Sequence, residues 1–204
     1  MIDFIEELKK VRAYNTFIPF YPERIKGYTD AEIAQIERDC NIHIHGQFRQ
    51  LLRQMGRCSG GLIWGWDICM YNYTWRYEQF TRYQNSVLID FYNDDETRNA
   101  WEQSNLHPAL NKIFIWNSSG ESTRCYYLIT TEPDDYLWEQ DEYDNDMLIT
   151  KTDLTILDDL QQQMEYWTNR FSANPNEMSP ENYQYRIDNS NELFEYYTIG
   201  RLLP

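Results

Sequence analysis

The spacing of apolar residues changes twice along this chain, and these changes constrain the fold more than any other feature. Residues 29–56 have apolar side chains at helical spacing, residues 62–71 and 112–130 have the pattern of β-strands, and residues 153–171 return to helical spacing. Helices grouped before and after a run of strands indicate an α+β fold rather than an alternating α/β fold. The sequence therefore predicts a single domain over residues 1–204, with a central, mainly antiparallel sheet and flanking helices.

A capping box marks the clearest helix. Thr29 and Glu32 have the spacing at which side chain and backbone cap each other at a helix start, and Ile33, Ile36 and Cys40 then form one apolar stripe. Residues 4–12 and the stretch between Gly46 and Gly56 also have one apolar face each and predict two further helices. The apolar face of the second of these consists of Phe48, Leu51, Leu52 and Met55.

Strand patterns occupy the middle of the chain. After Gly60 and Gly61, the stretch LIWGWDICMY has an apolar residue at every even position and predicts a strand over residues 62–71. KIFIWN and RCYYLIT flank the turn-forming SSGES and predict a hairpin, and MLIT at residues 147–150 predicts a short strand. Residues 74–105 are compatible with either strand or helix.

The last third of the chain begins with a predicted amphipathic helix. It starts at Thr152 or Asp153, and its apolar residues recur at spacings of three and four: Leu157, Leu160, Met164, Trp167 and Phe171. The composition of FSANPNEMSPEN, residues 171–182, predicts a loop. Residues 172–204 are expected to form an extension whose final segment, a short helix or strand, packs back onto the domain.

Charge is distributed unevenly. The formal net charge is −15, and residues 132–204 contribute 17 acidic against 4 basic side chains, a net of −13. A nucleic acid or an anionic membrane would be repelled by this surface, so neither is expected as a partner. A protein with a basic surface fits better. The sequence contains no apolar run of 18 residues and no leader pattern, so we expect a cytoplasmic location. The four cysteines show no CxxC spacing, and we expect all four to be reduced.

One segment concentrates this charge. Residues 132–146, EPDDYLWEQDEYDND, contain eight carboxylates, no Lys or Arg, and three large aromatic residues. Such a segment is either a solvated loop or a binding surface, and the aromatic residues among the acids favour binding. Its expected place is a solvated loop or a strand edge, with Trp138 alternatively in the core. The predicted partner-binding residues are Asp134, Asp135, Tyr136, Glu139, Asp141, Glu142, Tyr143, Asp144 and Asp146.

Catalytic motifs are missing from the sequence. It contains no GxSxG, P-loop, GxGxxG or HExxH pattern, and we predict neither an enzyme nor a cofactor. Cys40, His43, His45 and Cys58 offer zinc-type ligands, but their spacing matches no closed zinc motif, and the residues after Asp144 lack the glycine and glutamate of a calcium loop. No metal site is therefore predicted. The tryptophans leave a sugar-binding or sugar-cleaving protein as an alternative.

The order of these motifs resembles the SUKH superfamily over residues 29–171. The resemblance is carried by the capped helix with Ile33, Ile36 and Glu37, the FRQLL stretch at residues 48–52, Gly60–Gly61, the hairpin around Gly120, the acidic Trp-containing segment, and the helix near Asp153. Members of this superfamily are mostly bacterial immunity proteins of polymorphic toxin systems, with some fungal cell-wall regulators.

The resemblance implies an α+β sheet with packed helices, no catalysis, and a toxin as ligand. The resulting expectation is an immunity protein that occludes a cognate toxin with a basic surface. If that toxin is a nuclease, carboxylates can occupy the positions of substrate phosphates. A regulatory protein-binding scaffold of the fungal type is the alternative, and a carbohydrate-active protein is a third.

Overall fold

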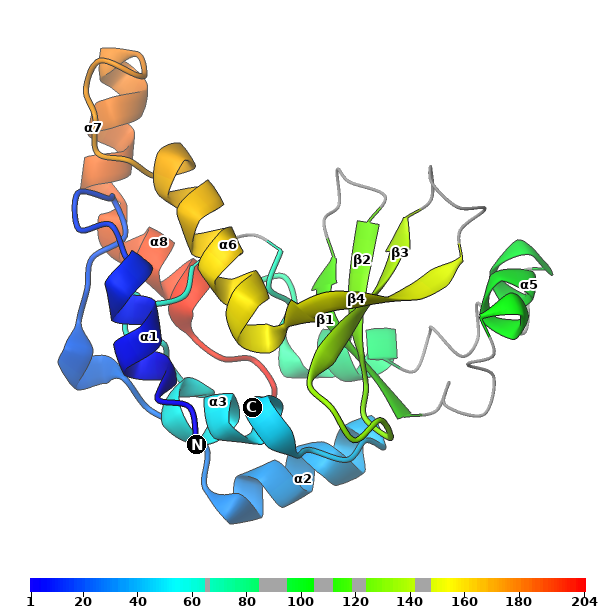
Figure 1. Cartoon of the computed structure of the whole chain (residues 1–204). Helices are drawn as coiled ribbons and strands as arrows, with labels where there is room; N and C mark the ends of the chain where they lie inside the picture. The colour runs from blue at the N-terminus through cyan, green and yellow to red at the C-terminus, as the bar shows by residue number, and fades with distance from the viewer. Residues whose placement is uncertain (65–66, 85–94, 105–111, 119–123, 142–147) are drawn as a thin grey trace.

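A computed structural model describes residues 1–64, 67–84, 95–104, 112–118, 124–141 and 148–204 (Figure 1). The helices are α1 (Phe4–Val11), the 3-10 turn η1 (Pro22–Arg24), α2 (Asp30–Cys40), α3 (Gly46–Met55), α5 (Asp95–Gln103), α6 (Ile156–Arg170), α7 (Pro180–Asp188) and α8 (Ser190–Thr198). Residues 77–84 are also helical. The strands are β1 (Ile113–Ser118), β2 (Arg124–Ile129), β3 (Tyr136–Asp141) and β4 (Ile149–Thr155). This order confirms the predicted α+β class.

The four strands form one antiparallel sheet in the order β1-β2-β3-β4. The predicted hairpin is confirmed, because β1 pairs with β2 in a register that places Phe114 opposite Leu128. The prediction that the acidic segment is a solvated loop or a strand edge is wrong for residues 136–141. These residues are β3, which pairs with β2 on one side and β4 on the other, and Leu137 is fully buried. The buried Leu137 between more exposed neighbours favours a strand in this segment despite its charges.

The predictions for the N-terminal helices are confirmed. α2 begins with the expected capping box, in which Thr29 and Glu32 each accept a hydrogen bond from the other's backbone. The backbone N–H of Thr29, followed by Arg57, lowers the pKa of Glu32 to about 2. α3 buries its predicted apolar face and ends at Gly56, and α1 covers residues 4–11.

The predicted strand over residues 62–71 is wrong. The described residues of this stretch form turns, with a single bridge between Ile68 and Asn117. Leu62, Ile63 and Trp64 are all fully buried, so side chains at odd and even positions both enter the core. Alternation of apolar and polar residues predicts a strand only where one face of the strand is solvated, and in residues 62–64 the side chains of both faces are buried.

Two predicted boundaries near the C-terminus also differ. β4 continues to Thr155, which caps α6 through a second capping box with Asp158, so the helix begins about three residues later than predicted. The segment 171–182 is not entirely loop, because Ser179 caps α7 and Pro180 occupies its first turn. Proline is compatible with that position because its missing N–H would have no partner there.

The chain end returns to the core. α8 buries Phe194 and Tyr197, and Leu202 and Leu203 are buried beyond it. Residues 77–84 and α5 show that much of the undetermined stretch is helical, while VLIDFY, residues 87–92, lies outside the described residues. The division of the chain into a core motif pattern over residues 29–171 and a C-terminal extension over residues 172–204 stays a prediction.

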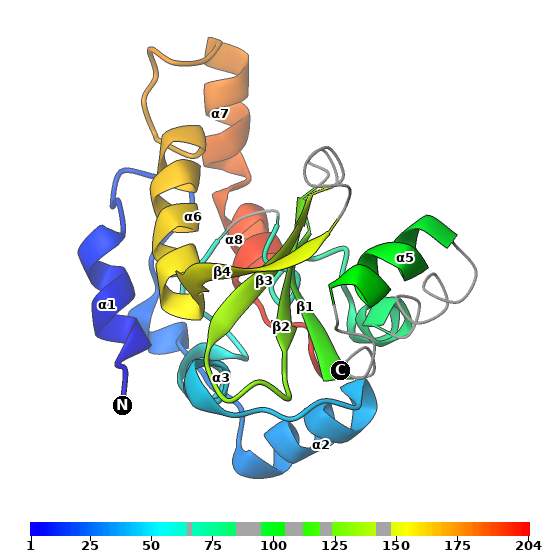
Figure 2. The ribbon, with the colours of Figure 1, turned by 45° about the vertical axis from the view of Figure 1, so that its right-hand side comes forward.

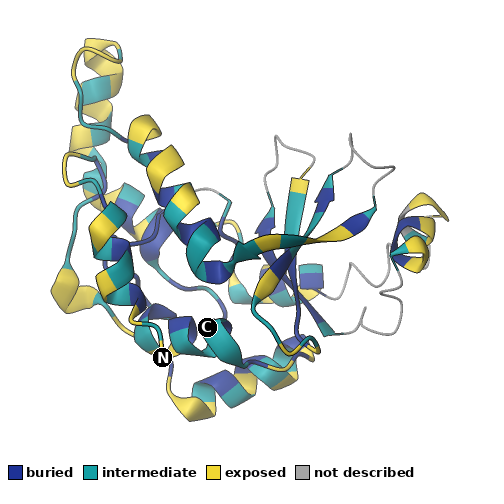
Figure 3. Cartoon of the chain, viewed as in Figure 1, coloured by how far each residue is buried: buried dark blue, intermediate teal, exposed yellow. Residues whose placement is uncertain are grey.

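Helices cover both faces of the sheet (Figures 1 and 2). Phe48 of α3 lies against Phe114 of β1, with ring centroids 4.6 Å apart, whereas Trp101 of α5 contacts Tyr127 of β2 at 5.7 Å. The end of α6 and the whole of α7 extend away from the sheet, and α7 has no buried residue. The chain therefore consists of a well-covered sheet and an exposed helical projection (Figure 3).

Candidate functional site

The turn before β3 uses its first carboxylates inside the fold. Asp135 accepts the backbone N–H of Gln47 at 2.7 Å and so caps α3 from another part of the chain. Gly46 makes this approach possible, because it has φ of 51° and a Cβ there would lie 1.9 Å from Asp135 Oδ1. The Gln47 side chain in turn accepts the Leu157 N–H at 3.0 Å. Asp135 thus joins the sheet to the starts of α3 and α6.

Lys151 compensates the neighbouring acids. Its ammonium group lies 2.6 Å from Asp134 Oδ2 and 3.4 Å from Glu132 Oε2, and 5.7 Å from the centre of the Trp138 ring. Desolvation acts to raise the pKa of Asp134, but hydrogen bonds from Lys151 and the Tyr136 N–H outweigh it, so the pKa is lowered. Asp134 is therefore stabilised in its charged form in the turn before β3.

Arg124 performs the same task at the other end of β3. It lies directly opposite Asp141 in the register, with 2.9 Å between Nη2 and Oδ2, and its Nε is 2.7 Å from Glu139 Oε1. Tyr126 donates its hydroxyl to Glu139 at 3.1 Å. The hydrogen bond to Asp141, followed by the charge of Glu139, raises the pKa of Arg124.

The structure therefore changes the interpretation of the acidic segment. Its four described candidate carboxylates, Asp134, Asp135, Glu139 and Asp141, all have internal partners, and their charge is largely used by the fold. Tyr136 is 42% exposed and remains available to a partner. The candidates Glu142, Tyr143, Asp144 and Asp146 lie outside the described residues, as does the proposed calcium loop. A partner-binding role for the segment stays a prediction.

A second acidic surface was not singled out from the sequence. Residues 165–192, which we call the acidic arm, comprise the end of α6, the connecting loop, α7 and the start of α8. All five carboxylates of the acidic arm are exposed: Glu165, Glu177, Glu181, Asp188 and Glu192. Glu177 and Asp188 accept hydrogen bonds only from neutral amides among the described side chains, so these bonds do not neutralise their charge.

The two arginines of the acidic arm each lie over an aromatic ring, with Arg170 exposed and Arg186 half-buried. Arg170 lies over the Trp167 ring at 5.1 Å, and Arg186 lies over the Phe171 ring at 5.0 Å. Among large apolar side chains, Tyr166 and Tyr185 are more than half exposed, and Ile187 is also exposed. The cations thus stabilise the arm by cation–π contacts, while carboxylates and apolar side chains face solvent.

The residues considered as metal ligands have different surroundings. Cys40 is buried, and burial raises the pKa of its thiol to about 12, which disfavours the thiolate that a metal requires. His43 Nδ1 lies 3.3 Å from Glu37 Oε1, and its ring is 5.3 Å from that of His45. In the described part of the chain, no three His, Cys, Asp or Glu side chains form a group suited to a metal ion.

The tryptophans give no support to sugar binding. Trp64 and Trp116 are fully buried and Trp167 nearly so, as core residues, while Trp66 lies outside the described residues. Trp116 donates its indole N–H to Asp159 Oδ2 at 2.7 Å, and burial raises the pKa of this carboxylate to about 6. Asp159 is a buried structural partner of the sheet.

Comparison with models of known protein families, with curated proteins and with solved structures gave no significant match to this chain. Across the described residues, no helix has both the length and the apolar character needed to cross a membrane.

Proposed function

We propose that this protein is an immunity protein, which binds a cognate toxin with a basic surface and occludes it at one-to-one stoichiometry. The acidic arm carries the proposal: five exposed carboxylates lie in a projecting helical segment that also exposes two tyrosines and an isoleucine. Carboxylates of this kind accelerate encounter with a basic protein, and apolar side chains beside them supply contact area. The likeness of the motif order to SUKH proteins supplies the class of partner.

The shape of the acidic arm suits this role. Because α7 buries none of its residues, its outward side can be covered without rearranging the core. Among the described residues, its acids form no ion pair, in contrast to those of β3, so their field extends into solvent. Tyr136 and residues 142–146 remain predicted as additional contacts, with a smaller share of the binding.

The first test is protection from the toxin domain encoded beside the gene for this chain. Co-expression is expected to restore growth, and the purified pair is expected to elute as a one-to-one complex without turnover of nucleotides, sugars or peptides. Absence of any adjacent toxin gene, or a multiple-turnover reaction lost on carboxylate substitution, would contradict the proposal.

The second test locates the interface. Substituting Tyr185→Ala together with Ile187→Ala removes exposed apolar area and is expected to weaken the complex by about thirtyfold, equivalent to about 2 kcal/mol. Asn99→Ala together with Gln103→Ala is the control, since both residues are exposed on α5, which lies far from α7 (Figure 1). Equal affinity of the two double variants would place the interface elsewhere.

A further inference from the structure

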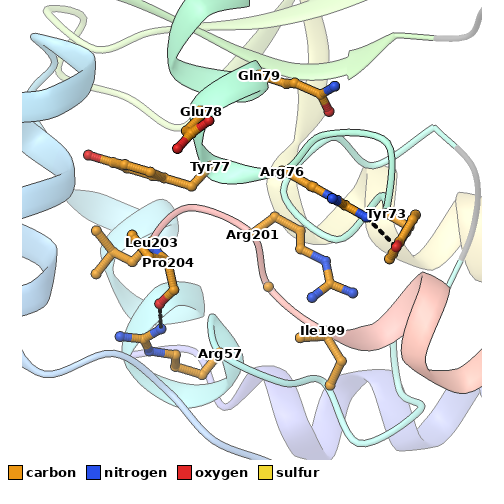
Figure 4. Close-up of a pocket in the computed structure, with 11 residues that line it drawn as sticks. Arg57, Tyr73, Arg76, Tyr77, Glu78, Gln79, Ile199, Arg201, Leu203 and Pro204 are labelled. Carbon is orange, nitrogen blue, oxygen red and sulfur yellow. Dashed lines mark hydrogen bonds between the residues drawn. The ribbon is translucent and has the colours of Figure 1, made fainter.

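A cavity of about 690 Å³ lies between Arg57, the start of the helix at 77–84 with the residues before it, and residues 199–204 (Figure 4). Its volume is within the usual range for small-molecule sites. Arg57, Arg76 and Arg201 line it, and Glu78 is the one acidic side chain among its described lining residues. In a chain with a net charge of −15, such a concentration of arginines requires an explanation.

Arg76 and Arg201 form no ion pair with a carboxylate among the described residues. Arg76 and Arg201 lie over the same ring, that of Tyr73, at 4.9 Å and 5.4 Å from its centre. Arg76 donates to the Tyr73 hydroxyl and Arg201 donates to the Glu195 carbonyl, both of which are uncharged acceptors. Two nearby carboxylates are used elsewhere, because Glu32 pairs with Arg57 and Glu195 with Arg24.

This arrangement favours an anion. Burial lowers the pKa of Arg201, the charge of Glu195 acts against this, and the charge of Arg76 adds to the lowering. The Nε of Arg201 is buried without a hydrogen-bond partner among the described residues. Two like charges beside one ring repel each other, and an anion placed between them offsets that repulsion. Guanidinium groups bind phosphate oxygens through paired hydrogen bonds, which makes phosphate the best-suited anion.

We propose that this cavity binds a small organic phosphate of mononucleotide size, with its phosphate between Arg76 and Arg201. The remainder of the cavity is lined by Tyr77, Ile199 and Leu203, which present aromatic and aliphatic surface to a ring. Tyr77 is held in place by its hydroxyl, which donates to Asp39 at 2.5 Å. The site shares no residue with the acidic arm, so its failure would leave the proposed function intact.

The test is calorimetric titration of the full chain with AMP, ADP, inorganic phosphate and adenosine. AMP and ADP are expected to bind more tightly than inorganic phosphate, and adenosine is expected to bind least. Arg76→Gln is expected to weaken AMP binding by about tenfold to a hundredfold, as for loss of a charge-assisted hydrogen bond. Arg76 is exposed, so this variant is expected to fold, which thermal denaturation checks.

Arg82→Gln is the matched control, because Arg82 is exposed on the helix that directly follows Arg76 and does not line the cavity. It removes the same charge and is expected to leave AMP affinity within about twofold, as suits loss of a distant, screened charge. Three results would overturn the proposal: no binding of AMP or ADP at millimolar concentration, inorganic phosphate binding as tightly as AMP, or equal weakening by both substitutions.

Discussion

The carboxylates of β3 and its preceding turn differ from those of the acidic arm in their surroundings, although residues 132–141 and residues 165–192 each contain five carboxylates. Asp135 caps a helix, Asp134 pairs with Lys151, and Asp141 pairs with Arg124. Glu165 and Glu181 are exposed on helices whose arginines lie over aromatic rings. A dense run of acids therefore identifies a charged segment, whereas the location of the cations decides whether that charge is available to a partner.

Asp159 extends this comparison to a carboxylate inside the core, and it gives the largest expected effect on stability. Burial raises its pKa in the folded state to about 6, well above the ordinary value for Asp, so the native protein binds this proton more tightly than the unfolded chain. The free energy of unfolding therefore falls as pH rises from about 4 to about 6 and is constant above that. Asp159→Asn keeps an acceptor for Trp116 and is expected to be more stable at pH 7 by about 2 kcal/mol.

Urea denaturation of both proteins at several pH values measures this effect. The advantage of Asp159→Asn is expected to disappear below about pH 4, where the carboxyl is protonated in both states. Parallel stability curves for the two proteins between pH 4 and pH 7 would show that Asp159 is not held in a desolvated site.

Asp135→Ala tests the internal use of the acidic segment. The substitution leaves the Gln47 N–H at the start of α3 without its acceptor and is expected to reduce the free energy of unfolding by about 1 kcal/mol. Glu181→Ala is the comparison from the acidic arm, and its expected effect is below about 0.5 kcal/mol. Chemical denaturation distinguishes them, and similar losses in the two variants would remove the distinction between the two groups of acids.

Arg124→Gln probes the paired acids at the other end of β3. Without the guanidinium, Glu139 and Asp141 retain their charges on a central strand, and the expected loss is about 0.5–1 kcal/mol at low salt. The difference from the unsubstituted protein is expected to shrink at high salt, because these groups are partly exposed and screened. A loss that does not change with salt would mean that Arg124 acts by packing.

The substitutions Glu165→Gln, Glu181→Gln and Glu192→Gln together are expected to have the smallest effect on stability. Their charges repel one another and the other acids of the arm, so the triple variant is expected to be equal in stability or up to about 0.5 kcal/mol more stable. Thermal denaturation is the measurement. A clear loss of stability would show that these acids have structural partners after all.

Local signals in the sequence predicted much of the fold. The capping box of Thr29 and Glu32 predicted α2 because its hydrogen bonds join residues only three apart. The strand predicted at 62–71 failed because burial on all sides depends on the tertiary structure. α7 was missed because Pro180 was interpreted as part of a loop rather than as the first turn of a helix.

The candidate sites could be predicted less well from the sequence than the fold. Partners such as Asp135 and Gln47 are 88 residues apart, so their pairing has no local signature. Arg57, Arg76 and Arg201 likewise come together only in the folded chain. The excess of acids after residue 131 did predict an acidic surface, but it could not separate compensated from uncompensated carboxylates.

The most direct test of the central claim is the association rate constant for the toxin, measured against ionic strength. For the unsubstituted protein, the rate is expected to fall on the order of tenfold between low and physiological salt, while the dissociation rate changes little. The triple variant of Glu165, Glu181 and Glu192 is expected to associate more slowly at low salt and with a shallower dependence. The matched triple variant Glu23→Gln, Glu96→Gln and Glu102→Gln removes three exposed acids outside the arm and is expected to keep the original slope. Equal slopes for the two triple variants would contradict binding through the acidic arm.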